Sequence, residues 1–210
     1  MTRMLALAAM AAAVLVAVGC DSSGGDIFPM SVGSSWHMDI TITSSGTAAS
    51  LDTSGTGTVV YTMADKANLT AGPEVVRYEG VETVHSLTPD STFTDTFHSY
   101  YRDEGDWILG YSTLDDTAPD TVMVTTPSVG MTWHSGTLLT EVVGQEDVSV
   151  PAKTYRKAWK IKSSSNQGGF DTQTFSWYAP GTGLVKTRYE LSYQGYSMVA
   201  EEVLTSATIK

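Results

Sequence analysis

The residues of this chain that could do catalytic chemistry are one serine and two histidines. Gly110–Leu114 reads Gly-Tyr-Ser-Thr-Leu and begins like the turn that exposes a nucleophilic serine, but it lacks the second glycine, and no helix is expected after it. His37 and His134 each follow a tryptophan, so a symmetric two-histidine site is conceivable. If those tryptophans are buried on strands, alternation turns both histidines towards solvent, and we favour that interpretation.

Two acidic groups are the only candidates for a metal site. Calcium takes about six to eight oxygen ligands, and acidic loops can supply some of them. Neither group follows the spaced pattern of calcium-binding helix pairs, and solvated hairpin loops explain both equally well. We therefore expect no metal, no cofactor and no catalytic residue. The acidic residues are Asp103, Glu104 and Asp106, and Asp115, Asp116 and Asp120.

Four tryptophans are the candidates for a ligand site: Trp107, Trp133, Trp159 and Trp177. Together with the tyrosines, they could line a cavity for an apolar ligand. Aromatic residues at strand spacing also serve as ordinary core, and that alternative stays open.

Cys20 is the only cysteine, so no intramolecular disulfide is possible. Arg3 precedes an apolar run from Met4 to Val18, which is shorter than the roughly 20 residues of a membrane-spanning helix. A basic start, a short apolar core and a small-residue exit are typical of a secretory signal. Ala17-Val18-Gly19-Cys20 resembles the lipobox of bacterial lipoproteins. This resemblance implies a signal peptide at residues 1–19, outside the folded domain, and a diacylglycerol on Cys20 as the mature N-terminus.

The mature chain is strongly acidic. The net charge of the whole chain is −11, and it becomes −12 without residues 1–19, which hold one basic and no acidic residue. This charge argues against a nucleic-acid partner. The predicted partner is the membrane, through Cys20 and a short lipidated tether at 20–26. Localisation is expected in the cell envelope, facing the periplasm or the cell surface, and Asp21 resembles a signal for retention in the inner membrane.

Residues 27–210 are predicted to form a single, all-β, antiparallel domain. Trp36, Met38, Ile40 and Ile42 alternate with polar residues, which is typical of a strand with one buried face. Short turns rich in glycine, proline and aspartate separate about eleven or twelve such strands. Turns this short exclude crossover helices. We expect a curved or partly closed, half-barrel-like sheet.

An internal repeat divides the domain. Residues 31–37 (Ser-Val-Gly-Ser-Ser-Trp-His) recur at 128–134 (Ser-Val-Gly-Met-Thr-Trp-His), with five of seven positions identical. The repeat predicts two units, at about 27–120 and about 126–210. Gly33 and Gly130 should allow tight turns, and Trp36 and Trp133 should be equivalent core anchors.

These motifs, with Val150-Pro151-Ala152 and the late Gly181-Thr182-Gly183-Leu184-Val185, resemble a group of bacterial lipoproteins that has no established activity. The pattern is also similar to half-open barrels of periplasmic lipoprotein carriers, an analogy of fold only. The predicted function is a non-catalytic envelope lipoprotein that binds a hydrophobic ligand or an envelope component. A purely structural or assembly-partner lipoprotein is the alternative, and a periplasmic enzyme is the third.

The lipid anchor gives the first testable prediction. Cys20→Ser removes the only thiol that can be acylated, so the protein should leave the membrane fraction or keep its signal peptide, while its fold is unchanged. Fractionation and intact-mass measurement check both results, with wild type as the control. A variant of mature length that still partitions with membranes would contradict the prediction.

Overall fold

Twelve β-strands make up the part of the chain that the structure, a computed structural model, describes: residues 26–46, 54–87 and 90–210. The predicted signal peptide, Cys20 and most of the tether lie outside these residues. None of the described residues belongs to a helix that is long and apolar enough to span a membrane. The strands are β1 (Ser35–Gly46), β2 (Gly55–Asn68), β3 (Glu74–Leu87), β4 (Asp90–Asp103), β5 (Trp107–Tyr111), β6 (Asp120–Val124), β7 (Thr132–Ser135), β8 (Leu138–Val150), β9 (Lys153–Gln167), β10 (Phe170–Ala179), β11 (Gly183–Tyr193) and β12 (Tyr196–Thr208).

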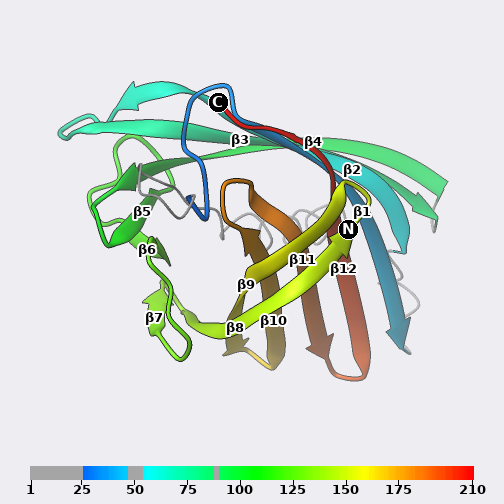
Figure 1. The fold of residues 1–210 in the computed structure, drawn as a ribbon. Coiled ribbons are helices and arrows are strands. Elements are labelled where there is room, and N and C mark those ends of the chain that lie inside the picture. Colours follow the sequence, from blue (N-terminus) through cyan, green and yellow to red (C-terminus); the bar gives the residue numbers. More distant parts are fainter. Residues whose placement is uncertain (1–25, 47–53, 88–89) are drawn as a thin grey trace.

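All twelve strands belong to one antiparallel sheet. Each strand pairs with its neighbour along the chain within β1–β6 and within β7–β12, and β1 also pairs with β12. The sheet curls until its edges, β6 and β7, lie close to each other, and β3 and β4 lie across from β8 and β9 (Figure 1). The predicted all-β, antiparallel, partly closed sheet is therefore confirmed.

The seam between β6 and β7 is bridged by side chains, since no ladder joins these two strands in the described residues. The backbone N–H of Gly136 donates to Oδ1 of Asp120 at 2.9 Å. Trp107 and Trp133 meet edge to face, with ring centroids 6.3 Å apart. The seam is thus the weakest lateral contact of the sheet.

The segment before β1 closes one end of the barrel-like sheet, which we call the tether end. Phe28 is fully buried and stacks on Trp36, with ring centroids 4.9 Å apart. Nε1 of Trp36 donates to the carbonyl of Thr182 in the turn between β10 and β11. At Gly183, whose φ is +87°, a Cβ would lie 3.1 Å from Phe28 and 3.2 Å from Nε1 of Trp36. The absence of a side chain at Gly183 therefore leaves room for Phe28 and Trp36, which we call the plug of the tether end.

The two repeat motifs form the same turn. Gly33 and Gly130 have φ angles of +90° and +86°, a region in which glycine avoids the strain of a Cβ. In each motif, two hydrogen bonds join the turn to one residue of the neighbouring strand. The carbonyl of that strand residue accepts from the glycine N–H, and its own N–H donates to the carbonyl of the residue that follows the glycine. These bonds join Gly33 and Ser34 to Met63, and Gly130 and Met131 to Val142.

The tryptophans that follow these turns have different surroundings. Trp36 is 1% exposed, and its ring and its N–H both have partners. Trp133 is 7% exposed, and its Nε1 has no hydrogen-bond partner among the described residues. It also lies on β7, an edge strand. The two positions are equivalent in the chain but not in their packing.

We therefore predict that Trp36→Ala destabilises the protein more than Trp133→Ala. Removing a buried tryptophan costs about 3–5 kcal/mol, a range that Trp36 should reach. Trp133→Ala breaks no hydrogen bond and should cost at least about 1 kcal/mol less. Urea unfolding of the mature-length chain measures both, and Trp36→Phe, which keeps a ring without the donor, is the control. Equal losses at the two positions would contradict this prediction.

Candidate functional site

Two glutamates lie inside the sheet, on strands whose inward positions are otherwise mostly apolar. Glu82 of β3 and Glu202 of β12 are each 4% exposed. Glu82 lies on the same, inward face of its strand as Tyr78 and Val84, and Glu202 lies on the same, inward face of its strand as Leu204. Burying a carboxylate is costly unless it is paired, protonated or hydrogen-bonded. The surroundings of these two groups therefore define a candidate site.

Glu202 accepts a hydrogen bond inside the sheet. The phenol of Tyr61 donates to its Oε2 at 2.8 Å. Burial raises the pKa of Glu202 to about 7; the Tyr61 hydrogen bond opposes this rise, and the charge of Glu82 adds to it. Burial and the charge of Glu202 in turn hold the pKa of Tyr61 well above its ordinary value. Tyr61 is thus a donor at neutral pH, and Glu202 is near its titration midpoint.

Glu82 is less well satisfied. Its Oε2 is buried and has no hydrogen-bond partner among the described residues. Burial raises the pKa of Glu82 to about 7, and the charge of Asp95, its cross-strand neighbour on β4, adds to the rise. The phenol oxygen of Tyr78, which lies near Tyr61 and Glu202, is also buried without a partner. Two polar atoms inside the sheet therefore have unused hydrogen-bonding capacity.

The opposite wall carries small hydroxyl groups. Thr140, Ser163, Thr174, Ser176 and Thr187 are buried on β8–β11. Thr140 and Ser163 share a hydrogen bond of 2.9 Å, and Thr187 is the cross-strand neighbour of Glu202. We call these hydroxyls, together with Glu82, Asp95, Glu202 and Tyr61, the polar layer.

Apolar side chains enclose the polar layer on two sides. Towards the tether end lies the main core, which includes Trp36, Tyr178 and Leu204. Towards the opposite end, where the β11–β12 turn lies, is a smaller cluster that includes Ile40 and Val84. A molecule that enters the polar layer would therefore meet both polar and apolar surface.

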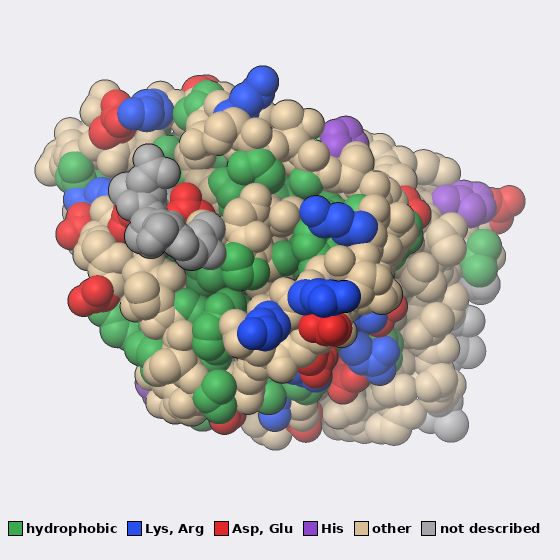
Figure 2. All heavy atoms as spheres, in the orientation of Figure 1, with side chains coloured by type: hydrophobic (Ala, Val, Ile, Leu, Met, Phe, Trp, Pro, Cys, Tyr) green, Lys and Arg blue, Asp and Glu red, His purple; other side chains and the backbone are tan. Residues whose placement is uncertain are grey.

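Charges are segregated between the two faces of the sheet. Away from the turns, the inward positions of β1–β4 and β10–β12 hold three carboxylates, Glu82, Asp95 and Glu202, and no Lys, Arg or His. Basic side chains lie on the molecular surface, as Figure 2 shows for one face. The inside of the sheet is thus purely anionic in these strands.

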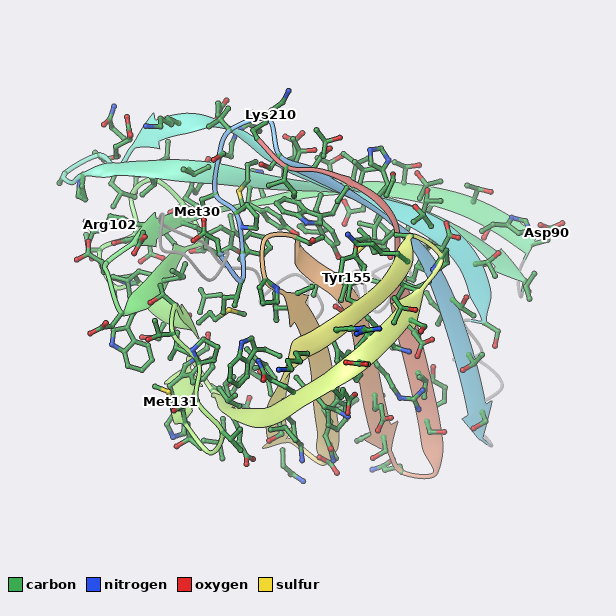
Figure 3. The ribbon with its side chains drawn as sticks, in the orientation of Figure 1. Met30, Asp90, Arg102, Met131, Tyr155 and Lys210 are labelled. Carbon is green, nitrogen blue, oxygen red and sulfur yellow. The ribbon has the colours of Figure 1, made fainter. Side chains whose placement is uncertain are left out.

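Solvent reaches the interior beside β4. Strand β5 pairs only with Tyr100–Asp103, so the rest of β4 has no partner on that side in the described residues. The inward side chains Phe93, Asp95, Phe97 and Ser99 remain partly exposed, whereas Tyr101 is buried. Figure 3 marks Asp90, where β4 begins, far from Met30 of the closed tether end. The inward side chains are thus buried at the tether end and partly exposed along β4.

The four tryptophans predicted to line a ligand site all belong to the main core or pack against it. Trp107 and Trp133 meet at the seam, and Trp159 packs against the main core. Trp177 lies on the opposite face of β10 from Ser176. Its Nε1 donates to Glu146 at 2.6 Å, and its ring lies under two lysines, Lys160 and Lys186. Trp177 therefore lies on the outer face of β10, where its ring is covered and only 6% exposed.

The remaining candidates lie in exposed or half-buried positions. His37 and His134 are exposed on their strands, and the Ser112 hydroxyl donates to Asp116 at 3.1 Å within a turn. Asp103 accepts the N–H of Gly105 at 2.7 Å. Across the ranges 26–46, 54–87 and 90–210, no three His, Cys, Asp or Glu side chains converge as a metal-binding group.

Sequence reasoning missed Glu82 and Glu202, although the sequence marks them. Every second residue of a strand faces inwards. In 76–84 these residues are Val, Tyr, Gly, Glu and Val, and in 198–204 they are Met, Ala, Glu and Leu. A carboxylate in the apolar phase of a strand is the detectable sign. Clusters of acidic residues along the chain do not carry this sign.

Comparisons with known proteins add little. No family model and no curated protein matches the chain. A solved structure described as a "putative exported protein with YmcC-like fold", from Bacteroides fragilis NCTC 9343, is 13% identical over 88% of this chain and 99% of its own, with a TM-score of 0.40. A "putative lipoprotein" from Parabacteroides distasonis ATCC 8503 is 12% identical over 89% and 100%, with a TM-score of 0.42. Both TM-scores are too low to support an inference about this chain.

The buried glutamates predict how stability changes with pH. Folding raises the pKa of each glutamate from an ordinary 4.5 to about 7. The folded protein therefore holds these protons more tightly than the unfolded chain. This contribution to the free energy of unfolding is fully present below pH 4.5 and is lost as the pH rises through about 7. In wild type, the free energy of unfolding should fall between about pH 5 and about pH 8. In Glu202→Gln, this fall should be smaller by about 2–3 kcal/mol. Urea titrations at both pH values measure this change.

The neighbouring Glu201→Gln is the matched control. Glu201 faces outwards and pairs with Lys186 at 2.8 Å, so its replacement should leave the pH dependence of stability unchanged. If Glu202→Gln has the same pH dependence as wild type, Glu202 does not titrate in this range, and the assignment is wrong.

Proposed function

We propose that this protein is a lipid-anchored, non-catalytic protein of the bacterial cell envelope that holds a small ligand with apolar surface inside its sheet. The anchor is inferred from the sequence around Cys20. The ligand is inferred from the interior, which is accessible beside β4 and contains buried polar atoms without partners. The unpartnered Oε2 of Glu82 in a polar layer between two apolar clusters is the observation that carries this proposal.

The chemistry of the interior supports binding rather than turnover. The polar layer offers carboxylates, phenols and hydroxyls, which can hold a molecule by hydrogen bonds. Aromatic rings next to it, such as Phe97 beside Tyr61 with centroids 6.2 Å apart, offer apolar contact. Small-molecule sites typically combine a few polar groups with a mostly apolar lining.

An assembly partner is the second candidate function. Leu87 is 60% exposed, and Phe170, which is 38% exposed, stacks on Tyr193 with centroids 4.0 Å apart. These side chains belong to strand ends opposite the tether end, which an anchored protein would present away from its membrane. Exposed apolar groups favour contact with another envelope protein.

Binding of a neutral fluorescent probe, N-phenyl-1-naphthylamine, tests the proposal. We expect the mature-length chain, residues 20–210 with Cys20→Ser, to bind the probe and enhance its fluorescence. Ser99→Trp places a large ring on the inner face of β4 and should weaken binding at least about tenfold, equivalent to 1.4 kcal/mol. His98→Trp adds the same ring on the outer face and should leave affinity unchanged.

Circular dichroism and thermal melting establish that both variants are folded. If the parent chain does not bind the probe, the ligand-binding proposal fails, and an assembly role becomes the better interpretation. Equal binding by the two tryptophan variants would place the probe outside the interior and would also contradict the proposal.

A further inference from the structure

We propose that the interior site takes an organic cation, a primary or secondary ammonium group attached to an apolar body, hydrogen-bonded by Glu82, with the charges of Asp95 and Glu202 nearby. This inference rests on the proposed ligand-binding function and narrows it to one chemical class.

Charge is the first reason. Away from the turns, three carboxylates face the inside of the sheet at the inward positions of β1–β4 and β10–β12, and no basic side chain accompanies them there. A buried carboxylate needs a counter-charge, a proton or a full set of hydrogen bonds. Tyr61 supplies one hydrogen bond to Glu202, but Oε2 of Glu82 receives none from the described residues. A cationic ligand would provide the missing counter-charge.

Hydrogen-bonding capacity is the second reason. Oε2 of Glu82 is an acceptor, and the unpartnered phenol oxygen of Tyr78, which is 1% exposed, has acceptor capacity as well. An ammonium group with N–H bonds donates to such atoms, whereas a quaternary ammonium group has no N–H to donate. A carboxylate or phosphate ligand would be repelled by the three acids.

The aromatic rings are the third reason. Tyr61 and Tyr78 stack with centroids 5.3 Å apart, and Phe97 meets Tyr61 edge to face. Rings of this kind attract cations through their π faces. A bare metal ion is a poorer fit, because the acids do not converge as a metal-binding group in the part of the chain that the structure describes. The smaller apolar cluster around Ile40 and Val84 lies beside the layer and suits the apolar body.

Competition against the neutral probe distinguishes these possibilities. Octylamine, octyltrimethylammonium, octan-1-ol and octanoate have the same alkyl chain and differ in the head group. With the mature-length chain at about pH 8, where carboxylates with a pKa of about 7 are mostly ionised, octylamine should displace the probe at a concentration at least about tenfold lower than octan-1-ol. Octyltrimethylammonium should be weaker than octylamine, and octanoate should be the weakest.

Glu82→Gln and Glu202→Gln test the residues. Each should reduce the preference for octylamine over octan-1-ol about tenfold, because a charge-assisted hydrogen bond or a nearby negative charge is lost. The preference is the ratio of the two displacing concentrations within one variant, so it does not depend on that variant's affinity for the probe. Glu201→Gln, on the outward side of β12, should keep the full preference. Calorimetric titration with octylamine gives the same comparison without the probe.

The outcomes separate the two proposals. Probe binding with equal displacement by octylamine and octan-1-ol overturns the ammonium proposal and leaves the ligand-binding proposal standing. An unchanged preference in both Glu82→Gln and Glu202→Gln overturns the assignment of these residues. If the parent chain binds neither the probe nor octylamine, the ligand-binding proposal itself fails.

Discussion

The antiparallel ladder between β1 and β12 joins the first and last strands of a chain in which every other ladder connects consecutive strands. It runs from Ser35 opposite Thr208 to Gly46 opposite Tyr196. Without it, β1–β6 and β7–β12 would be two meanders, each with an apolar face open to water. With it, both faces enclose one interior, and Glu202 lies beside Ile40, with strands β1 and β2 between it and Glu82. The polar layer therefore depends on this closure.

The same closure makes the glutamates unfavourable for stability. A strand turns alternate side chains to opposite faces, so Glu82 and Glu202 cannot reach solvent without a change of register. Their raised pKa reflects that constraint. A layer of this kind weakens the fold at neutral pH, and small apolar residues would pack there at lower cost. Its presence favours a function for the interior over a purely structural role.

The strands could be predicted from the sequence, because alternation and turn residues are local properties. The plug formed by Phe28 could not, since it depends on Trp36 and Gly183, which are far apart in the chain. Trp177 shows a second limit. In 175–178 both phases of the strand carry aromatic residues, so alternation alone does not say which phase faces inwards. Lysines on both neighbouring strands cover the Trp177 ring on the outer face of the sheet, where it is nonetheless buried.

The two halves of the sheet also explain where its opening lies. The two halves of the sheet, β1–β6 and β7–β12, meet at two places. The first and last strands, β1 and β12, meet at one, and the two middle strands, β6 and β7, meet at the other. The long strands β12 and β1 form a full ladder, whereas β6 and β7 have five and four residues and meet through Asp120 and Gly136. Shortening the middle strands leaves most of β4 without a partner on one side. If the two halves arose by the predicted duplication, the β12–β1 and β6–β7 contacts would be equivalent. The short strands at the β6–β7 contact would then make the interior accessible.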